Sequence, residues 1–309
     1  MNTDSSAAVQ TVSLYQAHNK IYPRAVTGRF VNWRWALVWL TQIAFYGLPW
    51  LNWNDRQAVL FDLASRRFYI FGLVLYPQDF IYLTAMLLLA AYSLFLFTAV
   101  SGRLWCGYAC PQTVYSEIFM WVERRLEGDR AARMKLDAAP WSAAKLMRKS
   151  GKQAAWVAIG LWTGFSFVGY FTPIVTLAGE AMTLSLSGWE SFWVLFYGFA
   201  TYGNAGYMRE QVCKYMCPYA RFQSAMFDKD TLIITYDSAR GEPRGSRSKK
   251  ADAASLGLGA CVDCNLCVQV CPTGIDIRHG LQYECSGCAA RVAACDGVRD
   301  KLGYPRGVP

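Results

Sequence analysis

Histidine is almost absent from this chain, which contains only His18 and His279 among its 309 residues. A haem group inside a membrane protein usually takes axial ligands from histidines on the spans, and neither of these histidines lies in a long apolar segment. The sequence also has no phosphate-binding loop, no dinucleotide-binding fingerprint and no Ser/His/Asp arrangement. These absences argue against a quinol-oxidising haem b core, a nucleotide-dependent enzyme and a triad hydrolase.

Charged residues are scarce in four long stretches of the chain, where they occur only near an end (Arg34, Asp79 and Glu190). The stretches are residues 33–53, 79–100, 154–177 and 189–208. The second holds no charged residue from Phe80 to Val100, and a helix of this length covers a hydrocarbon core of about 30 Å. The apolar run 68–76 is too short to span, so we predict an interfacial or turn segment there. The sequence predicts an α-helical polytopic membrane protein with about four transmembrane helices.

Basic residues gather in the segments between these stretches. The loop 101–153 carries ten Lys and Arg, the chain from Arg209 onward carries fourteen, and the loop 179–190 carries none. The positive-inside rule therefore places the N-terminus, the 101–153 loop and the tail in the cytoplasm of a bacterium, with the spans in its inner membrane. The same rule accounts for the net charge of +9, so no nucleic-acid partner is predicted. The first 30 residues lack the apolar region of a cleaved signal peptide.

Seven of the eleven cysteines fall between residues 261 and 295. The first four, Cys261, Cys264, Cys267 and Cys271, have the spacing C-x2-C-x2-C-x3-C and precede Pro272, which is the bacterial ferredoxin run. A single C-x2-C pair would also suit structural zinc, but four cysteines with this spacing favour iron and sulfide. A disulfide framework does not suit the reducing cytoplasm. We therefore predict a ferredoxin-like α+β module with a [4Fe–4S] cluster.

The second half of the array contains one substitution. It reads Cys285, Cys288, Arg291 and Cys295, with Arg291 where a symmetric two-cluster module has cysteine. By the crossing rule the first cluster takes Cys261, Cys264, Cys267 and Cys295, and the second is left with Cys271, Cys285 and Cys288. Arginine stays protonated and cannot ligate iron. The second site then holds a three-iron cluster, uses a non-cysteine ligand, or is empty.

A second cysteine motif, C-x3-C-P, occurs twice. Cys106 and Cys110 follow the second apolar stretch, and Cys213 and Cys217 follow the fourth. Residues i and i+4 share a helix face, so each pair can present two thiols together. Soft thiolates select Cu(I), zinc or iron–sulfur clusters. The alternative is that these cysteines are small apolar helix residues, but two copies at one membrane depth favour a redox or metal site.

Six segments follow from this organisation. They are a cytoplasmic N-terminal arm (1–32), a first transmembrane hairpin (33–100), a basic cytoplasmic loop with one C-x3-C-P motif (101–153), a second transmembrane hairpin (154–208), the other C-x3-C-P motif with a linker (209–250) and the ferredoxin-like module (251–309).

Several longer motifs resemble the FixG/CcoG/RdxA family, the accessory proteins of cbb-type cytochrome oxidases. They are IYPR at 21–24, FYGLPWLNWNDRQAVLFDL at 45–63, LVLYPQDF at 73–80, GRLWCGYACPQTVY at 102–115, VCKYMCPYARFQSAMFD at 212–228 and CVDCNLCVQVCPTGIDIRHGLQYEC at 261–285. The resemblance covers nearly the whole chain. It implies a membrane protein with [4Fe–4S] clusters that is needed for oxidase assembly and reduces Cu(II) to Cu(I).

The resemblance also implies roles and partners. Cys106, Cys110, Cys213 and Cys217 would be the catalytic, copper-binding thiols. The partners would be the membrane, oxidase assembly factors or a copper transporter, and a cytoplasmic electron donor. The chain departs from the family at Arg291 and at Pro309, where relatives continue into another span and a periplasmic domain. We therefore expect a fragment or a shortened paralogue.

Three functions compete at this point. The leading one is an electron relay from a cytoplasmic donor to thiolate-bound copper. The second is a quinol dehydrogenase-like polyferredoxin that feeds a periplasmic reductase, because such proteins share the two motifs. The third is a non-catalytic assembly scaffold, which Arg291 and the early end of the chain would suit.

Overall fold

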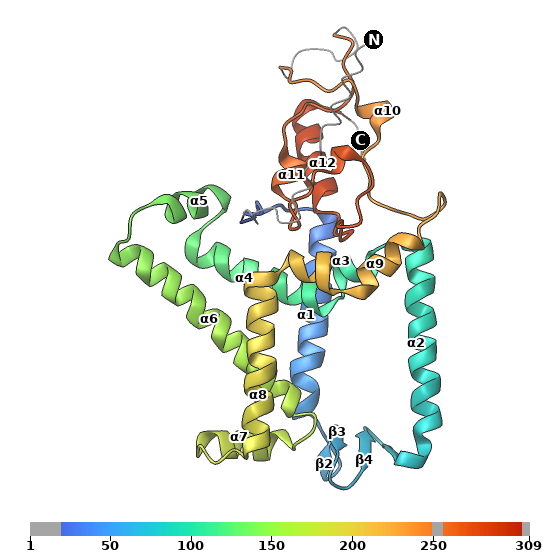
Figure 1. Ribbon diagram of the computed structural model, residues 1–309, viewed down its shortest axis with the longest axis vertical. Helices are drawn as coiled ribbons and strands as arrows, with labels where there is room; N and C mark the ends of the chain where they lie inside the picture. Colours follow the sequence, from blue (N-terminus) through green and yellow to red (C-terminus); the bar gives the residue numbers. More distant parts are fainter. Residues whose placement is uncertain (1–19, 249–255, 305–309) are drawn as a thin grey trace, which may run out of the picture.

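The computed structural model describes residues 20–248 and 256–304. Part of the predicted N-terminal arm, the end of the linker and both edges of the predicted module lie outside these described residues. Four long helices run between a cap of strands at one end and a shelf of short helices at the other (Figure 1). They are α1 (Arg29–Gly47), α2 (Phe80–Ser101), α6 (Ala143–Val168) and α8 (Gly188–Thr201), which continues as the π-helical segment η3 (Tyr202–Met208).

The cap joins the lower ends of the long helices. A two-stranded and a three-stranded antiparallel sheet form it, and in the latter Val59 lies opposite Ile70 and Phe68 opposite Leu75. The apolar run 68–76 therefore forms strands. The elements of the cap are η1 (Leu48–Trp50), β1 (Asn52–Trp53), β2 (Arg56–Gln57), β3 (Val59–Asp62), β4 (Arg67–Ile70), β5 (Leu73–Leu75), η2 (Pro77–Asp79) and α7 (Ile174–Met182).

The shelf lies across the upper ends of the long helices, and the cysteine-rich module stands on it (Figure 1). Both C-x3-C-P motifs belong to the shelf, so all eleven cysteines lie at one end of the molecule. The shelf contains α3 (Leu104–Tyr108), α4 (Pro111–Glu127), α5 (Arg130–Ala138), η4 (Val212–Met216) and α9 (Pro218–Ala225). The module and its linker contain α10 (Ser238–Gly241), α11 (Leu266–Gln269), η5 (Ile277–His279) and α12 (Ala290–Leu302).

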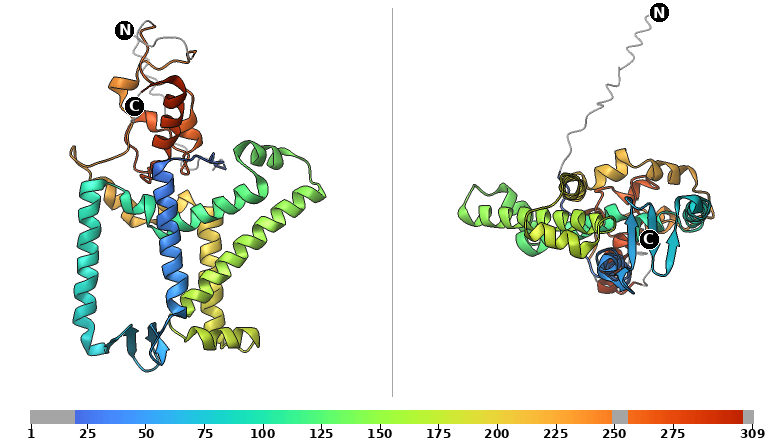
Figure 2. Two further views of the ribbon diagram at one scale, coloured as in Figure 1. Left: turned by 180° about the vertical axis from the view of Figure 1, so that it is seen from behind. Right: turned by 90° about the horizontal axis from the view of Figure 1, so that it is seen from below.

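One helix of the described residues, Pro77–Ser101, is long and apolar enough to cross a membrane, and none of its most apolar stretch is buried. It stands apart from the other long helices in both side views (Figures 1 and 2). Helix α1 contains Arg34, α6 begins with a basic segment, and α8 has 14 residues before the π-helical segment. The four-span topology therefore stays a prediction.

Two predicted span boundaries are wrong. The stretch 154–177 does not form one helix, because α6 ends at Val168 and α7 begins at Ile174, directly after Pro173. Proline lacks the amide hydrogen that a continuous helix needs and disfavours helical geometry in the preceding residue. The stretch 33–53 likewise ends its α-helix at Gly47, and Pro49 opens a short 3₁₀ turn.

Helices α6 and α8 pack closely through glycines. A Cβ atom on Gly164 would lie 2.2 Å from the Val194 carbonyl oxygen, and one on Gly160 would lie 2.7 Å from that of Gly198. Two small residues four positions apart let helix backbones approach in this way, above all in membranes.

This packing predicts opposite effects for one substitution at two sites on α6. Gly164→Ala should lower the free energy of unfolding by about 1–3 kcal/mol, because the new methyl group must push the helices apart. Gly151→Ala meets nothing within 4 Å and should raise stability by about 0.5–1 kcal/mol through helix propensity. Thermal unfolding of both variants in one detergent tests this, and shifts of the same sign would contradict the packing.

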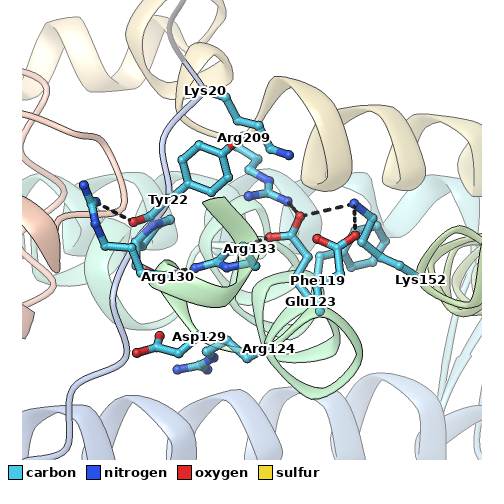
Figure 3. Close-up of polar contacts among 12 residues, drawn as sticks. Lys20, Tyr22, Phe119, Glu123, Arg124, Asp129, Arg130, Arg133, Lys152 and Arg209 are labelled. Carbon is cyan, nitrogen blue, oxygen red and sulfur yellow. Dashed lines mark hydrogen bonds and ion pairs between the residues drawn. The ribbon is translucent and has the colours of Figure 1, made fainter. Parts of the chain in front are cut away.

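A buried set of charged side chains joins α4, α5, α6 and the chain after η3 (Figure 3). The Glu123 carboxylate lies 3.0 Å from Arg133, 3.7 Å from Lys152 and 2.9 Å from Arg209. Its side chain is only 2 % exposed. Trp156 packs beneath this ion cluster, with its ring stacked on Phe119 at 5.2 Å between centroids. Four elements are therefore held at one point by charge and ring contacts together.

The module is not the α+β unit that we expected. Residues 256–304 form helices and loops without a strand. The backbone groups of residues 259–261 pair instead with the linker. Ala260 donates to the Arg240 carbonyl oxygen at 2.9 Å, and Gly259 donates to that of Pro243 at 2.8 Å. The described segment before the first cysteine run is therefore hydrogen-bonded to the linker and not to a strand of the module.

Candidate functional site

Both C-x3-C-P motifs have the same local geometry. Cys110 and Cys217 are the N-cap residues of α4 and α9, in extended conformation, and the following prolines occupy the first helical turn. Proline suits that turn because its missing amide hydrogen would be unpaired there in any case. Cys106 and Cys213 lie in the short helical segments just before, α3 and η4. The expectation that the two thiols of a pair share one continuous helix face is therefore wrong.

The fold places the thiols of the two motifs within electrostatic range of one another. The pKa of Cys106 is raised to about 12, first by burial and then by the nearby charges of Cys110 and Cys213. The pKa of Cys213 is raised to about 11 by burial, with Cys110 and Cys217 as its next causes. Thiols from two distant parts of the chain therefore influence one another. We call Cys106, Cys110, Cys213 and Cys217 the thiol quartet.

Two polar residues that the sequence did not single out line the quartet. The Cys106 thiol donates to the Gln223 side-chain oxygen at 3.3 Å, and Gln223 is fully buried. Arg103, which is 6 % exposed, donates to the Ala220 and Cys285 carbonyl oxygens and lowers the pKa of both Cys106 and Cys213. Arg103 could have been noticed in the sequence, because it is a single arginine directly after an apolar stretch. No feature of the sequence points to Gln223.

The first predicted cluster site forms one cavity. Cys261, Cys264, Cys267 and Cys295 line it together with apolar side chains of α12 and of the linker. The pKa of Cys295 is raised to about 11, first by burial and then by the other three thiols. Asp263 and Asn265 adopt positive φ between the cysteines, a conformation that Asn and Asp tolerate better than most residues. Four thiols around one apolar cavity fit a [4Fe–4S] cluster.

Arg291 fills the place of the missing ligand in the second cluster site. Its guanidinium donates to the Cys271 sulfur at 2.7 Å and to the Ile275 carbonyl oxygen at 3.2 Å. Burial raises the pKa of Cys285, while the Arg291 charge opposes that shift. Arg34 and Tyr108 interact electrostatically with Cys288. Cys271, Cys285 and Cys288 thus surround a cation instead of completing a four-thiol set.

No three Cys, His, Asp or Glu side chains within residues 20–248 and 256–304 converge on a point that would hold a single metal ion. A cubane cluster does not need such convergence, because each thiolate binds a different iron. The quartet can likewise offer a pair of thiolates to a copper ion without a preformed cage.

The shelf and the module touch at two glycines. A Cβ atom on Gly107 would lie 2.9 Å from the Gly287 carbonyl oxygen, and Gly287 itself has a φ of +68°. Gly107 lies between the cysteines of the first C-x3-C-P motif, and Gly287 lies between Cys285 and Cys288. The thiol quartet and the second cluster site are therefore in direct backbone contact.

Two family models match the chain. A 4Fe-4S dicluster domain matches residues 208–308, and a 4Fe-4S binding domain matches residues 82–128. Together they include every cysteine of the chain. The chain is thus an iron–sulfur protein of the electron-transfer class, and iron–sulfur clusters are its supported cofactors. No solved structure matches it.

Three curated relatives match over almost the whole chain. They are the nitrogen fixation protein FixG of Rhizobium meliloti (48% identical, 96% of this chain, 57% of the relative) and the proteins RdxA (43%, 96%, 63%) and RdxB (42%, 98%, 65%) of Cereibacter sphaeroides. The chain spans about three fifths of the length of these relatives. The family assignment from sequence motifs is confirmed: the chain belongs to the FixG/RdxA family.

Proposed function

We propose that the chain is an inner-membrane electron-transfer protein that reduces Cu(II) to Cu(I) during assembly of a cbb-type cytochrome oxidase. The observation that carries the proposal is the thiol quartet, which gathers four soft ligands beside an iron–sulfur module. Soft thiolates favour Cu(I) over Cu(II), so they stabilise the product of the reduction.

The residues divide the work between two sites. A [4Fe–4S] cluster held by Cys261, Cys264, Cys267 and Cys295 supplies one-electron transfer when it is bound. The quartet binds the copper ion, which gains one electron and leaves as Cu(I). The positive charge of Arg103 beside Cys106 and Cys213 offsets part of the rise in thiol pKa that burial causes. A cytoplasmic protein or cofactor supplies the electron.

The proposed topology puts both sites on the cytoplasmic side. The shelf and the module share one end of the long helices (Figure 1), and the basic loop 101–153 and the basic tail belong to that end. The positive-inside rule then orients the strand cap toward the periplasm. We propose α1, α6 and α8 with η3 as spans in addition to α2.

The double variant Cys106→Ala, Cys213→Ala tests the copper step. We expect Cu(II) reduction by the purified, chemically reduced protein to fall to the rate without protein, because one thiol of each pair is lost. Bound iron and sulfide should stay at the parent level, since the first cluster cavity is untouched. A chelator that is specific for Cu(I) gives the measurement.

The single variant Cys264→Ala is the matched comparison. It should lose the iron of the first site and, with it, copper reduction. Unchanged copper reduction in the double variant would rule out the quartet as the copper site. Oxidase assembly that proceeds normally with Cys264→Ala would favour the scaffold function.

A further inference from the structure

An apolar cavity of about 700 Å³ lies between α1, α4 and α6. Its volume lies within the range of about 300–1,000 Å³ that small-molecule sites occupy. These three helices are labelled in Figure 1. Five indole rings line its walls: Trp35, Trp39, Trp50, Trp121 and Trp162.

The lining says what kind of molecule fits. None of the residues around this cavity is charged. A phospholipid headgroup buried there would lack a cation to balance its phosphate, which is costly in an apolar site. Indole rings favour flat rings, through offset-stacked and edge-to-face contacts. The occupant is therefore neutral and carries a planar ring.

One polar group in the cavity has no partner. Gln42 lines the cavity, is 9 % exposed, and its side-chain oxygen is buried without a hydrogen bond. A buried acceptor without a donor is destabilising. Because the terminal torsion of glutamine is broad, a small rotation turns this oxygen toward a hydroxyl that enters the cavity.

The neighbouring hydroxyl groups are already committed to one another. Thr163 donates to the Ile159 carbonyl oxygen at 2.7 Å, so its oxygen accepts from Tyr46 at 2.9 Å. Tyr115 then donates to Tyr46 at 3.3 Å. These hydroxyl groups donate to one another and not to Gln42, so the Gln42 side-chain oxygen is left without a hydrogen-bond donor. The missing partner is thus a donor.

The cavity opens sideways. Trp39, Ile43 and Trp162 at its mouth are 61%, 67% and 45% exposed. In the membrane placement proposed above, this mouth faces lipid, so an aliphatic tail can leave through it. Helix α4 connects the cavity to the quartet. Ile118 in the cavity wall follows Cys110 by eight residues, so the two residues are separated by about 12 Å along the helix axis.

We propose that this cavity binds an isoprenoid hydroquinone. Its ring lies among the indoles, one ring hydroxyl donates to Gln42, and the tail extends into lipid. The proposal rests on the membrane electron-transfer function given above and names a membrane carrier for the same protein. An oxidised quinone has carbonyl oxygens and no ring hydroxyl, so the site binds the reduced form more tightly.

The experiment measures binding alone. The full chain in nanodiscs is equilibrated anaerobically with decylhydroquinone, with the oxidised quinone, or with decanol, and ligand retained beyond empty nanodiscs is quantified by chromatography. We expect saturable binding of one hydroquinone per chain and weaker binding of the quinone. Gln42→Leu should raise the Kd about tenfold, and Ala158→Trp, which fills the cavity, should abolish binding.

Gln78→Leu is the matched control, because Gln78 is exposed in η2 and should bind as the parent does. Non-saturable partition, equal competition by decanol, or equal Kd values for Gln42→Leu and Gln78→Leu would each overturn the proposal. If Ala158→Trp fails to fold, the Kd of Gln42→Leu, in which the side chain keeps a similar size, still tests the proposal. No copper is present, so a failure of copper reduction leaves this result standing.

Discussion

Arg291→Cys should raise the iron content of the anaerobically purified protein from about four to about eight atoms per chain. In the parent, the Arg291 guanidinium donates to the Cys271 sulfur, and the side chain is only 7 % exposed. A cation at this position takes the volume and one thiolate that a cubane would use. Cysteine restores the fourth ligand and removes the charge, so the second site becomes a complete four-thiol set.

Iron and sulfide analysis with electron paramagnetic resonance gives the readout. The reduced variant should show the broadened spectrum of two interacting clusters, and the reduced parent the spectrum of one. Lys301→Cys is the control, because it adds an exposed cysteine to the same helix and should add no iron. About eight iron atoms in the parent would show that Arg291 does not block the site, and about seven would indicate a three-iron cluster.

Glu123→Gln should lower the free energy of unfolding by about 3–5 kcal/mol. The substitution keeps the size of the side chain and removes the only charge that Arg133, Lys152 and Arg209 share at that point. Two of these cations, Arg133 and Lys152, have side chains 3% and 6% exposed. Removing this carboxylate leaves Arg133 and Arg209 without their buried counter-charge, whereas Lys152 keeps Glu127 at 2.9 Å.

The same carboxylate predicts a pH dependence. Burial alone would raise the pKa of Glu123, but Arg209, Lys152 and Arg133 hold it below its ordinary value of 4.5. A carboxyl group with a lowered pKa in the folded state contributes stability above its unfolded pKa and loses it as the pH falls. The parent should therefore lose stability below about pH 4.5, and Glu123→Gln should lose less over that interval.

Chemical unfolding of both proteins across this pH range is the measurement. Glu242→Gln is the matched control, since Glu242 pairs with Arg244 at 3.6 Å on the surface and is 41 % exposed. An exposed pair contributes about 0–1 kcal/mol. Equal losses for the two variants would show that the ion cluster has no special weight.

The sequence predicted the chemistry of the site better than its surroundings. The grouping of Cys261, Cys264 and Cys267 follows from their local spacing, and Cys295 was added to them by the crossing rule of two-cluster ferredoxins. The approach of Cys106 to Cys213 depends on how two distant helix pairs pack, and the motif repeat only suggested it. Gln223 and Arg103 at the quartet are tertiary contacts without a spacing signature.

The fold shows a similar division. Apolar length predicted the positions of α2 and of α8 with η3, but it overran Pro173 and Pro49, where backbone chemistry ends the helix. Hydropathy also does not distinguish apolar residues that face lipid from apolar residues that line a cavity. The cavity at Gln42 therefore could not be predicted from the sequence. Only the packed structure shows that several tryptophans line one cavity together with a side-chain oxygen that lacks a hydrogen bond.

The contact between Gly107 and Gly287 limits which ferredoxin modules can be combined with this membrane part. Gly107 has no room for a side chain, and Gly287 has a positive φ with Arg103 close to it. The two glycines come from parts of the chain that two separate family models match. A different ferredoxin joined to these helices would have to supply a glycine at the same point of its second cysteine loop. A larger residue at Gly107 would therefore require a shift of the module backbone, although each part carries a cysteine pattern that stands on its own.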